Sequence, residues 1–283
     1  MRLFSSRLLN VGIVTATSHS FKKIIFANDK FVAINNYGFY TSNDCYYWEE
    51  CVIDTSTIDP SQYLVVNGYW GWSDITHLNG KFVAISGSII AISTDLLTWN
   101  IYKGVGLNSS NYCAITNNGN KFIMLSEDGY IAESEDAINW TETFISQLSE
   151  ILPQDIAYGN SCCLIVGLNG CAYNLNHGYG SWIIRTDVNF SLENVDFGNG
   201  IFVATGFSDK IVYFNDNSHI FNYTNIPNVS LWLGVSYCNN NFIIVSPENV
   251  AFSNSGSVWN KVPLQDYASY GGAAYGNNRY VIS

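Results

Sequence analysis

The sequence predicts an all-β fold: a seven-bladed β-propeller of four-stranded antiparallel blades, forming one domain over residues 1–283. Three observations lead to this prediction. A short apolar phrase recurs about every 40 residues, a polar turn phrase follows most of its copies, and the two chain ends each carry part of one repeat. A period of this length, with four short strands per unit, is what one propeller blade requires.

The recurrent phrase is an apolar run, a turn rich in Asn and Gly, and a second apolar run that begins with a marker residue. The markers are Phe31, Phe82, Phe122, Cys163, Phe202, Phe242 and Tyr280. The intervals between them are 51, 40, 41, 39, 40 and 38 residues. Because Asn and Gly tolerate positive φ, this turn predicts a hairpin that joins the inner two strands of each blade.

The second phrase reads Ser-x-Asp-x-x-x-Trp at residues 42–48, 93–99 and 134–140, with degenerate copies at 215–221 and 253–259. Its Ser and Asp oxygens are expected to accept hydrogen bonds from backbone N–H groups of the turn. The Trp is expected to pack beneath the turn. The phrase thus predicts the outer hairpin of each blade.

This phrase resembles the Asp-box, or BNR, repeat Ser-x-Asp-Gly-x-Thr-Trp of sialidase-like, photosystem-assembly-factor-like and phage-tail propellers. Cys45, Leu96 and Ala137 stand where the box has its glycine. The resemblance covers nearly the whole chain and implies a propeller in which the boxes lie on outer turns, away from the ligand-binding face.

The two chain ends predict how the ring closes. Six whole repeats begin near residues 24, 74, 114, 155, 194 and 234, and the seventh stops after two strands. Residues 3–11 align with residues 91–99 of the second repeat. We therefore expect a composite seventh blade, with residues 272–283 as inner strands and residues 1–14 as outer strands. Such a blade removes the last open sheet edge.

Composition limits the class of partner. Charged residues make up 12% of the chain, about half the usual share. The net charge is −11, with 12 Lys plus Arg and no basic cluster beyond Lys22-Lys23. Nucleic-acid binding needs cationic groups for the phosphates, so we expect no nucleic-acid partner. No apolar run is long enough to span a membrane, so no membrane insertion is expected, and a virion or cytoplasmic location is predicted.

No metal or cofactor motif occurs. The seven cysteines include no Cys-x-x-Cys pair and predict buried free thiols, and the four histidines are dispersed. A sialidase-like reaction needs three clustered arginines, whereas this chain has only Arg2, Arg7, Arg185 and Arg279. Two of them lie in the expected N-terminal closing strands and Arg279 lies in an inner hairpin turn, so no arginine triad is expected. The sequence therefore predicts no cofactor and no enzyme. A glycoside hydrolase that uses a carboxylate such as Asp128 is the least favoured alternative.

The long first interval predicts the binding site. About 11 extra residues lie between Trp48 and Ile75 and are expected to form a loop on the face opposite the boxes. A loop of this kind on a rigid scaffold commonly carries binding residues. Tyr63, Tyr69, Trp70 and Trp72 are candidates for an aromatic platform, although an aromatic recurs at the repeat position of Trp72 and suggests a packing role there. The rim candidates on the same face are Tyr37, Asp128 and Phe207.

These residues favour a recognition or assembly propeller. The favoured hypothesis is a virion component, such as a phage tail or fibre protein, that binds a host-surface glycan or a neighbouring structural protein. The alternative is a cytoplasmic scaffold or assembly factor that uses the same face for a protein partner.

Overall fold

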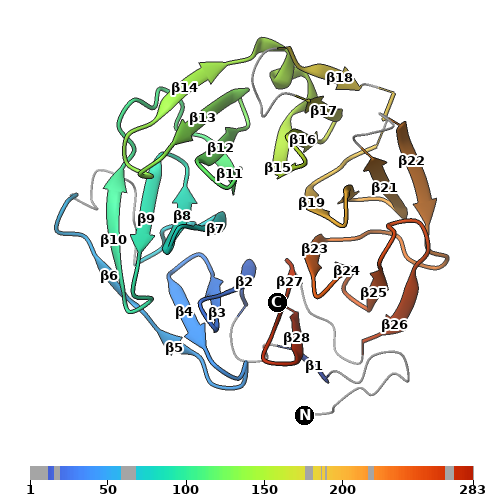
Figure 1. The fold of residues 1–283 in the computed structure, drawn as a ribbon, viewed down its shortest axis with the longest axis horizontal. Helices are drawn as coiled ribbons and strands as arrows, with labels where there is room; N and C mark the ends of the chain where they lie inside the picture. The colour runs from blue at the N-terminus through green and yellow to red at the C-terminus, as the bar shows by residue number, and fades with distance from the viewer. Residues whose placement is uncertain are drawn as a thin grey trace.

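The computed structural model describes residues 12–15, 20–58, 68–175, 181–185, 187–188, 190–215, 220–264 and 271–282. Within them, the β-sheets lie side by side around a ring, and the first strand of each repeat faces the centre (Figure 1). The first strands of adjacent sheets contact one another all the way round, from β2 through β7, β11, β15, β19, β23 and β27 back to β2. No helix in the described part of the chain is long and apolar enough to cross a membrane.

Six sheets are blades with four consecutive antiparallel strands. Blade 1 contains β2 (Lys23–Ala27), β3 (Lys30–Ile34), β4 (Phe39–Ser42) and β5 (Glu49–Glu50). Blade 2 contains β7 (Asp74–Leu78), β8 (Lys81–Ser86), β9 (Ile89–Ser93) and β10 (Thr98–Lys103). Blade 3 contains β11 (Tyr112–Asn117), β12 (Phe122–Ser126), β13 (Tyr130–Ser134) and β14 (Thr141–Phe144). A 3₁₀ helix, η2 (Ser146–Ile151), joins blade 3 to blade 4.

The remaining blades follow the same order. Blade 4 contains β15 (Pro153–Gly159), β16 (Cys162–Gly167), β17 (Gly170–Asn174) and β18 (Ile183–Arg185). Blade 5 contains β19 (Asn194–Gly198), β20 (Ile201–Thr205), β21 (Lys210–Asn215) and β22 (Ile220–Asn225). Blade 6 contains β23 (Gly234–Cys238), β24 (Asn241–Val245), β25 (Asn249–Ser253) and β26 (Asn260–Pro263).

The prediction of seven four-stranded blades is wrong, because the structure forms six. The sheet between blades 6 and 1, here called the closing sheet, has three described strands: β27 (Ala273–Gly276), β28 (Arg279–Ile282) and β1 (Gly12–Thr15) (Figure 1). β1 pairs with β28 in parallel, whereas the expected composite blade required antiparallel neighbours. β1 runs in the direction of a fourth blade strand but pairs directly with the second. Residues 1–11 of the expected outer strands lie outside the described residues.

The extra residues after blade 1 also differ from the expected loop. β6 (Val52–Asp54) pairs in parallel with the outer strand β10, so that blade 2 becomes a five-stranded sheet. The backbone N–H of Val52 donates to the carbonyl of Leu97 at 2.8 Å. Part of the insertion therefore covers the outer edge of blade 2 and satisfies backbone groups that an edge strand leaves unpaired.

The hairpin turns and the core follow from the recurrent phrase. Six inner hairpins have two-residue turns in which both φ angles are positive: 28–29, 79–80, 160–161, 199–200, 239–240 and 277–278. This is the conformation expected of Asn- and Gly-rich hairpin turns. The aromatic markers are buried. Each pair of adjacent sheets encloses one apolar cluster, so the core is a ring of layers between sheets.

The outer turns have the hydrogen bonds expected of the second phrase. In blade 3, Ser134 Oγ accepts from Ala137 N at 2.8 Å, and Asp136 Oδ1 accepts from Ile138 N and Asn139 N at 2.8 Å each. Trp140 Nε1 donates to the Ala137 carbonyl at 3.2 Å. Ala137 adopts a φ of 67°, the left-handed conformation that favours glycine at this position of the phrase.

Candidate functional site

A central channel runs between the innermost strands. It has a volume of about 400 Å³ and is lined by residues from the six blades and the closing sheet. Each innermost strand begins at the same end of the channel, and the loops between the second and third strands lie at that end too. We call this end the loop face. The outer turns that carry the Ser-x-Asp phrase lie at the opposite end, as strand alternation requires.

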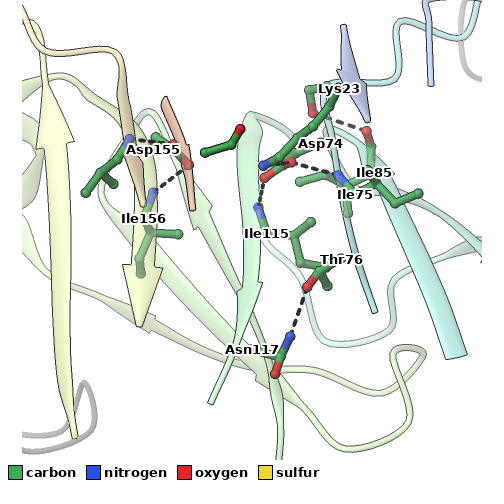
Figure 2. A network of polar contacts seen from close by, with 12 residues as sticks. Lys23, Asp74, Ile75, Thr76, Ile85, Ile115, Asn117, Asp155 and Ile156 are labelled. Atoms are coloured by element: carbon green, nitrogen blue, oxygen red, sulfur yellow. Dashed lines mark hydrogen bonds and ion pairs between the residues drawn. The ribbon is translucent and has the colours of Figure 1, made fainter. Parts of the chain in front are cut away.

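Asp74 is the centre of the polar network in the channel wall (Figure 2). Its Oδ1 accepts from the backbone N–H of Ile75 at 2.7 Å, and its Oδ2 accepts from Ile115 N of the next blade at 2.8 Å. The Lys23 ammonium of the preceding blade pairs with Oδ1. One carboxylate thus joins three consecutive blades. Lower in the wall, Asn117 Nδ2 donates to Thr76 Oγ1 at 3.0 Å across the same junction.

The same bridge recurs elsewhere around the channel. Asp155 accepts from Ile156 N at 2.8 Å and, across the junction, from Val195 N at 2.9 Å. Asp196 accepts from Phe197 N at 2.8 Å and, across the next junction, from Tyr237 N at 2.6 Å. At the following junction the Ser236 hydroxyl accepts from Ala273 N at 3.0 Å. These side chains replace the hydrogen bonds that separate sheets cannot make with each other. We call them the inter-blade bridges.

Burial and mutual repulsion set the protonation of the bridge groups. Burial raises the pKa of Asp155 to about 7, and the negative charge of Asp74 adds to the rise. Lys23 and the two backbone N–H donors lower this pKa, but their effect is the smaller one. Burial also raises the pKa of Asp196. Burial lowers the pKa of Lys23, but Asp74, Asp155 and Asp196 more than offset it, so the net change is a rise. The channel therefore carries one firmly protonated amine and a carboxyl group that titrates near neutral pH.

The sequence analysis missed these groups, although their signal is present. Lys23, Asp74 and Asp155 each stand eight residues before the marker of their repeat, at or near the start of the innermost strand of their blade. A charged residue at one fixed repeat position, followed by a strand that faces a ring centre, indicates a channel-lining group. Loop length and aromatic content do not detect it.

The aromatic candidates meet where blade 1 joins blade 2 on the loop face. The rings of Tyr37 and Tyr69 lie 5.6 Å apart at an interplanar angle of 90°, and Trp70 stacks on Trp72 at 5.6 Å and 18°. Tyr37 is 55% exposed and Tyr69 47%, whereas Trp72 is fully buried against Phe39. We call Tyr37, Tyr69 and Trp70 the aromatic corner.

Backbone hydrogen bonds hold the aromatic corner in place. Trp70 N and Gly71 N both donate to the Asn36 carbonyl, at 2.8 and 2.9 Å, and so tie the connection before β7 to the β3–β4 loop. Ser86 Oγ donates to the Trp70 carbonyl at 2.6 Å. Gly71 adopts a φ of 73°, and the position of its absent Cβ lies 3.4 Å from the Tyr69 ring. The backbone on both sides of the aromatic corner is therefore held in place. A ligand that binds the two exposed rings orders little further backbone, so little conformational entropy is lost on binding.

The other candidates lie apart from the aromatic corner. Asp128 is exposed in blade 3, where its Oδ1 accepts from Ser109 Oγ at 2.8 Å. Phe207 is 60% exposed in blade 5. Neither contacts the aromatic corner in any interaction between described residues, and Tyr63 lies outside those residues. The structure therefore brings together four of the seven candidates.

The part of the chain that the structure describes contains no group of three or more His, Cys, Asp or Glu side chains arranged to hold a metal ion. All seven cysteines are free thiols. Burial raises the pKa of the two that line the channel, Cys113 and Cys238.

Comparison with known proteins identifies the fold. No family model and no curated protein matches the sequence. Among solved structures, virginiamycin B lyase from Staphylococcus aureus is 12% identical with a TM-score of 0.73, over 91% of this chain and 89% of that chain. YCF48 bound to D1 peptide is 14% identical with a TM-score of 0.65, over 89% and 83%. The WD40 β-propeller domain of Doa1 is 11% identical with a TM-score of 0.67, over 94% and 89%.

These neighbours establish a β-propeller and nothing finer. Asp-box membership, a phage-tail origin and glycan binding find no support among them. The prediction that the chain is not an enzyme is contradicted, because virginiamycin B lyase and a streptogramin B lyase share the fold. The missing sialidase-type arginines exclude one reaction rather than catalysis in general. At 12% identity the likeness shows the fold alone and carries no lyase reaction to this chain.

Proposed function

We propose that this propeller recognises an extended segment of a partner protein on its loop face, with the aromatic corner as the anchor. The observation that carries the proposal is the pair of exposed tyrosine rings at a right angle, on two backbone segments that hydrogen bonds join. Exposed, rigid aromatic side chains are the groups that most often dominate protein interfaces. The solved complex of the similar propeller YCF48 with a peptide adds support for a peptide ligand.

A surface glycan is the second candidate, because the faces of Tyr37 and Tyr69 also suit the apolar face of a sugar ring. The virion component and the cytoplasmic assembly factor suggested by the sequence differ in the identity of the partner protein rather than in the surface used. Sequencing a partner that co-purifies from the native source separates those two.

Selection from a displayed random-peptide library tests the proposal, with a glycan array probed in parallel. We expect peptides whose binding falls at least tenfold in Tyr69→Ala and Tyr37→Ala, since each truncation removes a central aromatic anchor worth about 2 kcal/mol. Tyr47→Ala is the matched control, because Tyr47 is 80% exposed on an outer turn at the opposite face. Peptides that bind all three variants equally would refute the proposal. Glycan binding lost in the same two variants, without peptide binding, would favour the second candidate.

A further inference from the structure

The aromatic corner offers two electron-rich ring faces. The rings of Tyr37 and Tyr69 meet edge to face, so a group that enters the angle between them contacts both. The quadrupole of each ring makes its face negative and attracts a cation that lies within about 6 Å of the ring centre. Asn35 Oδ1 accepts from Tyr37 N at 2.8 Å and from Gly38 N at 3.0 Å, which fixes the loop that carries one wall.

A carboxylate stands beside this corner. The position of the absent Gly38 Cβ lies 3.9 Å from Glu50 Oε1, so Glu50 faces the loop that carries Tyr37. The Glu50 side chain is exposed and makes no hydrogen bond or ion pair with any described residue, whereas its backbone pairs with Tyr40 in the sheet. An exposed carboxylate against the loop that carries Tyr37 adds to the attraction for positive charge and repels an acidic group.

Three of the protein's own cations lie over other rings. Arg185 lies 4.7 Å from the centre of Phe221, Lys210 lies 4.7 Å from Phe190, and Arg279 lies 5.0 Å from Tyr46. No Lys or Arg among the described residues lies over Tyr37 or Tyr69. The net charge of −11 attracts a basic partner from a distance.

We propose that the aromatic corner, together with Glu50, binds a lysine or arginine side chain of the partner polypeptide. The inference rests on the proposed function and specifies the chemistry of the ligand. A lysine or arginine places its charge over the rings and against Glu50, whereas its aliphatic stem covers apolar ring surface. A neutral apolar side chain contacts the rings but gains no attraction from Glu50. An acidic side chain meets repulsion from Glu50 and from the ring faces.

Titration with four blocked pentapeptides, Gly-Gly-X-Gly-Gly, tests the ligand chemistry. X is lysine, arginine, norleucine or glutamate, and binding is followed by the backbone NMR resonances of Tyr37, Tyr69 and Trp70 in the full chain. We expect the lysine and arginine peptides to bind about threefold to thirtyfold more tightly than the norleucine peptide. Their affinity should fall as salt concentration rises. Equal affinity of the norleucine peptide, or the absence of shifts at these resonances with every peptide, would overturn the inference.

Variants separate the carboxylate from the rings. Glu50→Gln should lower affinity for the lysine peptide about twofold to fivefold, as expected for loss of an exposed ion pair, and leave the norleucine peptide unaffected. Glu49→Gln is the matched control, because Glu49 is also exposed and points to the other side of the same strand. An equal effect of both substitutions would contradict a specific role of Glu50.

The two proposals can fail separately. If library selection yields peptides that depend on Tyr69 and carry no basic residue at the anchor, protein recognition stands and this inference fails. A second outcome is that selection yields no peptide that depends on Tyr69 while the lysine pentapeptide still shifts the NMR resonances of the aromatic corner. In that case the aromatic corner binds a basic side chain but does not anchor a partner segment.

Discussion

The pH dependence of stability gives a direct test of the inter-blade bridges. In the folded chain the pKa of Asp155 is raised from 3.8 to about 7, because burial and Asp74 disfavour the carboxylate. The folded state therefore holds the proton of this group more tightly than the unfolded state does. The stabilisation is fully present below the unfolded pKa and is lost as the pH rises through about 7.

The size of the effect follows from the two pKa values. Linkage gives a loss of about 2.5 kcal/mol in unfolding free energy between pH 5 and pH 8, as an upper bound. Because Asp155 is only partly covered in the channel wall, we expect about 1–2 kcal/mol. Asp196 and Glu193, whose pKa values burial raises, act in the same direction. Burial lowers the pKa of His77, which acts in the opposite direction.

The comparison of wild type with Asp155→Asn isolates the single group. Urea unfolding followed by tryptophan fluorescence at several pH values from 5 to 8 gives the unfolding free energy of each protein. We expect the wild type to lose about 1–2 kcal/mol more than the variant across this range, because the amide does not titrate. Parallel pH profiles for the two proteins, or a wild type that loses less than the variant, would refute the assignment of Asp155 as a group that titrates near neutral pH.

Two further predictions concern packing and turns. Gly198→Ala should destabilise the fold by about 1–3 kcal/mol in urea unfolding, because the new Cβ would lie 2.0 Å from the Tyr237 ring of the next blade. In Gly272→Ala the nearest atom would be 3.5 Å away, so a comparable loss there would contradict this reasoning. Ser134→Ala should cost about 1–3 kcal/mol, since its buried Oγ accepts from Ala137 N. A melting temperature equal to that of the wild type within experimental error would show that this turn does not need the hydroxyl.

The features that repeat could be predicted from the sequence. The interval of about 40 residues reflects blades of nearly equal length, and the Asn- and Gly-rich turns have one conformation because a two-residue hairpin requires positive φ. Repetition supplies several independent examples of the same local constraint. The hydrogen bonds of the outer turns were predictable for the same reason, since each is local to a few residues of the chain.

The features that occur once could not be predicted. β6 has three residues and no alternating pattern, and it is held by parallel pairing to a strand more than 40 residues away. β1 has four residues, and its parallel register with β28 joins segments at opposite ends of the sequence that no local pattern links. Within the site, the tyrosines of the aromatic corner were proposed from loop length and residue type. Their perpendicular rings depend on contacts between two blades that no local pattern encodes.

The seam between the closing sheet and blade 1 has a consequence for how the chain folds. Asn277 Nδ2 donates to the Asn43 carbonyl, and Arg279 Nη1 to the Asp44 carbonyl, across 234 and 235 residues of sequence. Contacts between such distant residues form slowly, because a very long loop must close first. During synthesis, blade 1 cannot pack against the closing sheet until β28 has left the ribosome. Until then its inner strands and Phe26, which later packs against Gly276, are open to chaperones or to a second nascent chain.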